Sequence, residues 1–153
     1  CVRGADRVGE CLLADARQEA YYLRALDRPA FEVLRSAPVV FHRQQQAFES
    51  RTEYPILRFA GDDFVQVRSS YFTYAPPKLP FAEMEHWYRA YAKFSRLVAS
   101  PTYQHCFRLE PGDFVFYDNF RMLHGRMAFS GPRWMKGIYF DYSGDQVVRA
   151  AQL

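Results

Sequence analysis

The spacing of apolar residues along the chain predicts one long helix, over 81–98. Large apolar side chains recur there at steps of three and four residues, and Pro80 and Pro101 bracket the segment. The residues in question are Met84, Trp87, Tyr88, Tyr91, Phe94 and Val98. An aromatic stripe of this kind is typical of a helix face that packs on a sheet, so we interpret it as core rather than as a cofactor site.

Two shorter helices are predicted nearer the start of the chain. Asp15, followed by Gln18, resembles an N-cap with its reciprocal partner, and apolar residues then fall near helical spacing over 15–26. Asp27 and Pro29 indicate that a further short helix begins directly afterwards.

Most of the remaining chain has the character of short strands. The predicted strands are 39–42, 55–59, 64–71, 105–109, 114–118 and 135–142. Pro111 and Gly112 occupy the two central positions that a type II turn prefers, so 105–109 and 114–118 are expected to pair as a hairpin. Short strands with one long helix outside them favour an α+β, mainly β fold: a sandwich or barrel of the jelly-roll type that carries helices on one face.

Length and composition narrow the class of protein. The 153 residues suffice for one ordinary domain, and 49% hydrophobic with 24% charged residues excludes a disordered tail. Aromatic residues reach 18%, which makes a cavity built from rings plausible. No apolar run approaches the length of a membrane-spanning helix, so we expect a soluble protein that does not bind membranes.

Charge and cysteine patterns exclude several functions. The formal charge is only +3 and the arginines are scattered among acids, whereas nucleic-acid binding normally needs a basic face. Cys1, Cys11 and Cys106 are odd in number and lack CxxC spacing, which favours a reducing compartment and argues against a cysteine zinc site. Neither a glycine-rich phosphate loop nor a GxSxG elbow is found.

The segment richest in candidate chemistry runs from 109 to 142. An apolar strand ends in Asp118 and Asn119, and His124 follows, with Gly125 allowing a close backbone approach. Arg133 then begins another apolar strand. Imidazole suits divalent iron, and a guanidinium grips a carboxylate at two points. The residues alone leave simpler interpretations open. His124 could be a structural histidine and Arg133 a solvated arginine, and Asp118 and Asn119 could be turn residues that only end a strand.

The string EPGDFVFYDNFRMLHGR, together with Arg133 and then Gly137-Ile138-Tyr139, resembles the C-terminal half of the γ-butyrobetaine and trimethyllysine dioxygenase family, relatives of taurine dioxygenase. The resemblance continues more weakly through Gly9-Glu10, Val67-Arg68 and the Trp87-Tyr88 helix. It implies a double-stranded β-helix, or jelly roll, with flanking helices.

The resemblance also implies an activity and a site. The activity would be the hydroxylation of a trimethylammonium amino acid, with iron(II) as cofactor and 2-oxoglutarate as cosubstrate. The first candidate reaction is γ-butyrobetaine to carnitine, and trimethyllysine is the alternative substrate. Ascorbate is a further possible cofactor. His124 would be the distal iron ligand, Arg133 would hold the distal carboxylate of 2-oxoglutarate, and Tyr139 would belong to the cage around the trimethylammonium group. We assign no further catalytic residue.

Some features depart from the family pattern. Phe120 replaces the usual Trp, and Ser69 and Ser70 replace an Asn pair. None of the four histidines begins a His-x-Asp motif, which supplies the other two iron ligands in this family.

We therefore interpret 1–153 as the C-terminal part of a single Fe(II)/2-oxoglutarate oxygenase domain, incomplete at its N-terminus and inactive alone. The rival interpretation is a non-catalytic binding or scaffold domain that has lost iron. In either case we expect a small-molecule ligand and no nucleic-acid partner. The expected location is the cytoplasm, with the mitochondrion as the alternative, and a homodimer is a possible oligomeric state.

Overall fold

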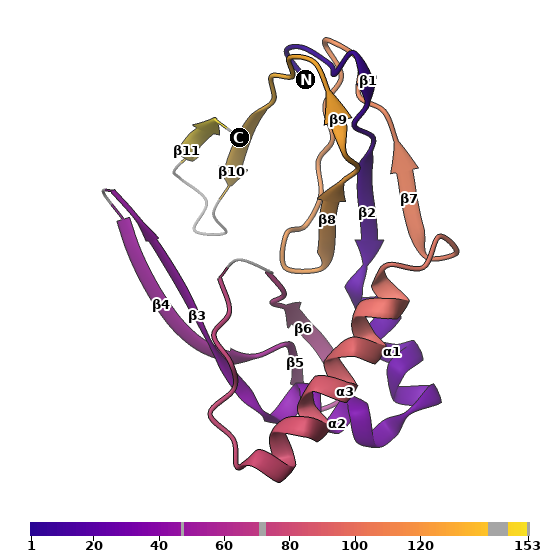
Figure 1. Ribbon diagram of the computed structural model, residues 1–153, viewed down its shortest axis with the longest axis vertical. Coiled ribbons are helices and arrows are strands. Elements are labelled where there is room, and N and C mark those ends of the chain that lie inside the picture. Colours follow the sequence, from indigo (N-terminus) through magenta and orange to yellow (C-terminus); the bar gives the residue numbers. More distant parts are fainter. Residues whose placement is uncertain (47, 71–72, 141–146, 153) are drawn as a thin grey trace. The chain divides into compact units, whose positions relative to one another are not determined.

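The computed structural model describes residues 1–46, 48–70, 73–140 and 147–152 (Figure 1). Its elements are β1 (Arg7–Val8), β2 (Cys11–Asp15), α1 (Ala16–Leu26), α2 (Arg28–Ser36), β3 (Pro38–Gln45), β4 (Phe48–Pro55), β5 (Leu57–Ala60), β6 (Asp63–Val67), α3 (Phe81–Val98), β7 (Gln104–Phe107), β8 (Met122–Arg126), β9 (Phe129–Ser130), β10 (Lys136–Phe140) and β11 (Val147–Gln152).

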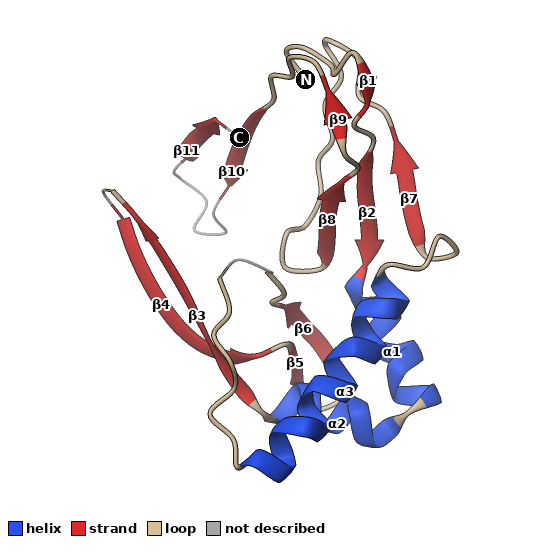
Figure 2. Cartoon of the chain, in the orientation of Figure 1, coloured by secondary structure: helices blue, strands red, loops and turns tan. Residues whose placement is uncertain are grey.

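The chain divides into two compact units. We call Leu13–Gln104 with Asp118–Leu123 the helical unit, and Cys1–Leu12 with His105–Tyr117 and His124–Leu153 the strand unit. All the helices of the described residues belong to the helical unit (Figure 2). None of them is both long and apolar enough to cross a membrane.

The first two helices begin where the capping residues predict. The Asp15 carboxylate accepts the backbone N–H of Arg17 at 3.2 Å, and α1 starts at the next residue. Asp27 caps α2 by accepting the N–H of Ala30 at 3.0 Å, with Pro29 in the first turn, where its missing N–H costs nothing.

The third helix, α3, has the bounds predicted from its flanking prolines. Its buried side is formed by Trp87, Ala90 and Phe94, and the Trp87 ring stacks on Tyr91 with the centroids 5.1 Å apart. The predicted stripe is wrong in one member, because Tyr88 is 41% exposed. It follows Trp87 directly, so the helical twist turns it toward the solvent side.

Two hairpins complete the helical unit. β3 pairs with β4 in an antiparallel ladder from Pro38↔Pro55 to Gln45↔Phe48, and β5 pairs with β6 from Leu57↔Val67 to Ala60↔Asp63. The predicted strand 55–59 is therefore divided between two hairpins. Of the predicted strand 64–71, the part up to Val67 lies in β6, and position 71 lies outside the described residues.

The strand unit contains small sheets. β1 pairs with β9 and β10 with β11, both antiparallel, and a three-stranded sheet, to which both units contribute residues, has the order β7-β2-β8. The predicted turn is confirmed, since Gly112 has φ +98° and the N–H of Asp113 donates to the Glu110 carbonyl at 2.9 Å.

The hairpin predicted around that turn is wrong. Residues 114–118 form no strand in the described structure, and β7 pairs with β2 instead. The local turn signal was sufficient for the turn, but strand pairing depends on which distant segment offers hydrogen-bond partners. The fold is thus mixed α/β, with several small sheets in place of one continuous sandwich.

Candidate functional site

His124 and Arg133 both belong to the strand unit, where a small group of side chains connects them. His124 lies within β8, and not after a strand as the sequence suggested. Its imidazole ring packs against Tyr117, with the ring centroids 5.3 Å apart and the planes inclined by 45°. The residue keeps part of its surface exposed, yet the covered part of the ring lowers the pKa of His124 through desolvation, which favours the neutral imidazole.

Arg133 approaches the same group from the segment between β9 and β10. Its Nη2 lies 3.8 Å from the Sγ of Cys11 in β2, and its guanidinium carbon lies 5.8 Å from the centroid of the Phe129 ring. No carboxylate of the described residues forms an ion pair with it within 4.0 Å. The guanidinium therefore lies against a sulfur atom and a ring face, with no carboxylate partner among the described residues.

Tyr117 joins the two halves of this group. Burial raises the pKa of its phenol, and the electrostatic effects of Tyr139 and Cys11 raise it further. The predicted cage residue Tyr139, 45% exposed in β10, therefore lies within electrostatic range of the phenol that packs on His124. Tyr117 thus contacts His124 and lies within electrostatic range of Tyr139 and of Cys11, the residue whose sulfur lies beside Arg133.

Sequence reasoning missed Tyr117, Cys11 and Phe129 as members of this group. Tyr117 looked like one more residue of an apolar strand, and Cys11 lies 122 positions from Arg133. The only available signal was the weak resemblance through Gly9-Glu10, which covers the segment directly before Cys11.

The group does not make a complete metal site. Among the residues that the structure describes, no three His, Cys, Asp or Glu side chains lie close enough together to hold a metal ion. His124 supplies one nitrogen, whereas iron of the class implied by the resemblance takes two histidines and a carboxylate. The residues present thus supply one ligand of such a centre.

Asp118, which precedes His124 in the chain, serves local structure. The Asp118 carboxylate accepts the N–H of Phe120 at 2.8 Å, and the Asp118 carbonyl accepts the N–H groups of Arg121 and Met122. This turn belongs to the helical unit.

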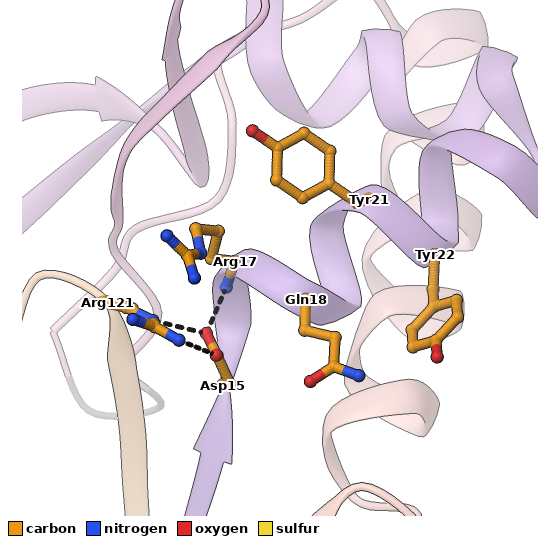
Figure 3. A pocket seen from close by; sticks show the side chains of 6 residues that line it. All are labelled: Asp15, Arg17, Gln18, Tyr21, Tyr22 and Arg121. Atoms are coloured by element: carbon orange, nitrogen blue, oxygen red, sulfur yellow. Dashed lines mark hydrogen bonds and ion pairs between the residues drawn. The ribbon is translucent and has the colours of Figure 1, made fainter.

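Arg121 binds Asp15 in the helical unit, as a supporting ion pair. Figure 3 shows its guanidinium meeting the carboxylate in a shallow pocket beside α1; Nε donates at 3.0 Å, and Nη2 donates to the other oxygen. This hydrogen bond lowers the pKa of Asp15. Because the charged pair in this pocket is already neutralised, the pocket is a weaker candidate than the group around His124.

Comparisons with known proteins agree with the resemblance. The model of the family described as taurine catabolism dioxygenase TauD, TfdA matches residues 1–139. The chain is 30% identical over 137 residues to a gamma-butyrobetaine dioxygenase of Pseudomonas sp. (strain AK-1), covering 87% of this chain and 36% of that protein. It is also 30% identical over 139 residues to a trimethyllysine dioxygenase of Neurospora crassa, covering 87% of this chain and 30% of that protein.

The chain spans about a third of the length of these relatives. Among solved structures, an asparagine oxygenase in complex with Fe(II), 2S,3S-3-hydroxyasparagine and succinate matches with a TM-score of 0.65 at 19% identity, over 86% of this chain and 39% of that one. At this identity the likeness concerns the fold alone: the chain shares the fold of this asparagine oxygenase over the matched part. Because the family model matches residues 1–139, which is most of the sequence, the chain belongs to the taurine catabolism dioxygenase TauD, TfdA family.

Proposed function

We propose that this chain carries the distal iron-ligating and 2-oxoglutarate-binding groups of an oxygenase that hydroxylates a trimethylammonium amino acid, with γ-butyrobetaine as the first candidate. In the overall reaction one oxygen atom of O2 enters a C–H bond as a hydroxyl group, and the other enters succinate as 2-oxoglutarate loses carbon dioxide. The observation that carries the proposal is that His124, packed on Tyr117, and Arg133, held at Cys11 and Phe129 without an acidic partner among the described residues, lie in the same unit.

Each of the three residues has a chemically suitable surrounding. The imidazole of His124 is partly covered and is held in orientation by the Tyr117 ring. Arg133 has no acidic partner among the described side chains, so its planar donors are available for the distal carboxylate of 2-oxoglutarate. Tyr139 is 45% exposed and offers a ring face to a cation that cannot donate hydrogen bonds.

Two alternatives remain, each with its own support. Trimethyllysine as the substrate is supported by the Neurospora crassa relative, which matches as well as the γ-butyrobetaine enzyme. A non-catalytic domain that has lost iron is supported by the lack of a three-ligand cluster in the described parts of the chain. The three free cysteines are consistent with a reducing compartment such as the cytoplasm.

The first experiment titrates the 15N-labelled chain with 2-oxoglutarate while the arginine Nε–H signals are followed by NMR. We expect the Arg133 signal to shift, and Arg133→Met to weaken binding at least about tenfold, because a bidentate charge-assisted contact is lost. Arg126→Met is the matched control, since Arg126 stacks on the same Phe129 ring, at 4.2 Å, without touching Cys11. Equal losses in both variants, or no binding by the unaltered chain, would contradict the role of Arg133.

A second experiment separates the enzyme from its rivals. The gene upstream of the Cys1 codon is sequenced, and the product of the complete reading frame is assayed for succinate formation with γ-butyrobetaine and with trimethyllysine. A His-x-Asp motif and turnover of γ-butyrobetaine support the proposal, and a preference for trimethyllysine selects that alternative. Lack of the motif, together with no turnover, supports the non-catalytic domain.

A further inference from the structure

The two faces of the β3–β4 hairpin differ in charge. Side chains alternate between the faces, so the register places Phe41 and Arg43 on one face with their partners Thr52 and Ser50, and Tyr54 lies on that face as well. The acids of β4, Glu49 and Glu53, lie on the opposite face. We call the face without acids the hydroxyl-arginine face.

Arg68, directly after β6, lies against this hydroxyl-arginine face. Its guanidinium carbon is 5.0 Å from the centroid of the Tyr54 ring and 5.8 Å from that of Phe41, and Nη1 donates to Thr52 Oγ1 at 2.6 Å. The backbone N–H of Arg68 donates to the Ile56 carbonyl at 2.8 Å, which fixes the start of the side chain. The guanidinium plane is therefore held between two rings and one hydroxyl group.

This cation has no counter-ion in the described structure. No described carboxylate lies within 4.0 Å of Arg68, nor of Arg58, whose guanidinium lies 5.5 Å from the same Tyr54 ring. Removing a guanidinium from water costs free energy unless a partner restores its hydrogen bonds, and a neutral hydroxyl satisfies only one of five N–H donors. A half-buried arginine that is fixed but not neutralised is typical of a site that receives an anion.

Thr52 can contribute a second contact. Its hydroxyl oxygen accepts from Arg68, so its own O–H proton remains available as a donor on the same side. A carboxylate placed there can accept from the remaining guanidinium donors with one oxygen and from the threonine hydroxyl with the other. The Ser69 hydroxyl is instead engaged with Tyr91, at 2.9 Å.

We propose that Arg68 and Thr52 form a carboxylate-binding site on the hydroxyl-arginine face, with the positive charges of Arg58 and Arg43 increasing its affinity. Every residue of the site belongs to the helical unit. The ligand class is a small organic carboxylate, and the site does not depend on the proposed function.

The test uses the 15N-labelled 153-residue chain and three probes: γ-butyrobetaine, butyrate and inorganic phosphate. Binding is followed at the arginine Nε–H signals. We expect γ-butyrobetaine and butyrate to shift the Arg68 signal, and Arg68→Met to weaken both at least about tenfold. Arg58→Met is the matched control, because it removes the same charge beside the same ring but no contact with Thr52, and it should weaken binding less than about threefold.

Two further variants separate binding from folding. Arg68→Lys keeps the charge but loses the planar donors, and Thr52→Val removes the hydroxyl; each should weaken butyrate binding while the thermal transition of the chain stays unchanged. If the carboxylates leave the Arg68 signal unmoved, or if Arg58→Met costs as much as Arg68→Met, the site is overturned. Phosphate binding more tightly than butyrate identifies a phosphate ligand and overturns the assignment of a carboxylate.

Failure of the proposed function gives a different result. If butyrate binds at Arg68 as tightly as γ-butyrobetaine, while Arg133 shows no response to 2-oxoglutarate, the oxygenase proposal fails and the carboxylate site stands. The reverse pattern, with 2-oxoglutarate bound at Arg133 and no carboxylate at Arg68, overturns the present inference alone.

Discussion

Glu19 should make the stability of the helical unit fall as the pH rises. The side chain is 1% exposed in α1, and its Oε2 has no hydrogen-bond partner in the described structure. Burial raises the pKa of Glu19 to about 7, and the nearby charge of Asp15 contributes in the same direction. The folded state therefore holds a proton that the unfolded state releases near the ordinary glutamate pKa of 4.5.

The sign and size follow from proton linkage. A raised carboxyl pKa gives stability that is complete below pH 4.5 and is lost as the pH rises toward about 7, above which the difference is constant. At about 1.4 kcal/mol for each pKa unit, the loss between these two values is at most roughly 3 kcal/mol. His124 has a lowered pKa and acts in the opposite direction near 6.5, so the wild-type curve alone is not diagnostic.

The assay compares urea unfolding of the unaltered chain with that of Glu19→Gln at several pH values between about 4 and 8. The amide cannot ionise, so the difference in unfolding free energy should shift in favour of the variant by up to roughly 3 kcal/mol over this range. Glu19→Met repeats the test without new amide donors. Glu83→Gln, an exposed acid in the first turn of α3, is the matched control and should show a change below about 0.5 kcal/mol. Parallel curves for the unaltered chain and Glu19→Gln would refute the reasoning.

Three other changes have expected outcomes. Asp15→Asn should cost about 1 kcal/mol near pH 7, because the pair with Arg121 is partly exposed. The pKa of Asp15 is lowered in the fold, so this cost should be complete above the ordinary value of 3.8 and should be lost as the pH falls below it; urea unfolding at neutral and acid pH checks this. Gly131→Ala should destabilise the chain by at least about 1 kcal/mol more than Gly61→Ala, because both have positive φ but only Gly131 would place its new Cβ against Asp6; thermal unfolding compares them. The strand unit exposes many large rings, so the chain should bind a hydrophobic dye, and a lack of dye binding would contradict this expectation.

Local signals predicted the helices well. The bounds of α3 follow from prolines on either side of an apolar period, and Asp15 and Asp27 fix the starts of α1 and α2 through their own carboxylates. Each of these signals acts within a few residues, so the sequence contains all the necessary information.

Strands were predicted less reliably because their partners are distant. Residues 114–118 have a strand-like composition, and the turn before them forms as expected, yet they join no strand in the described structure. β2 lies between β7 and β8, which come more than ninety positions later in the chain. No local sequence pattern predicts which of these distant strands will pair.

The same difference applies to the candidate site. His124 and Arg133 could be selected from a short motif, whereas Cys11 and Tyr117, which connect them, could be recognised only after folding. Whether these residues bind iron and 2-oxoglutarate stays a prediction.

The arginines show most clearly what folding adds to the sequence. As a sequence they are scattered evenly among acids, and any of them could be a solvated or ion-paired residue. In the structure Arg24, Arg89 and Arg121 have carboxylate partners, whereas Arg68 and Arg133 are fixed by ring faces and by a neutral hydroxyl or sulfur atom. An arginine that is neutralised within the fold can contribute to stability but has little attraction left for a ligand, because its strongest donors are already used. Substitution of Arg121 should therefore lower the stability of the chain and leave anion binding intact. Substitution of Arg68 or Arg133 should weaken anion binding and leave stability unchanged. This contrast separates binding arginines from structural ones without reference to catalysis.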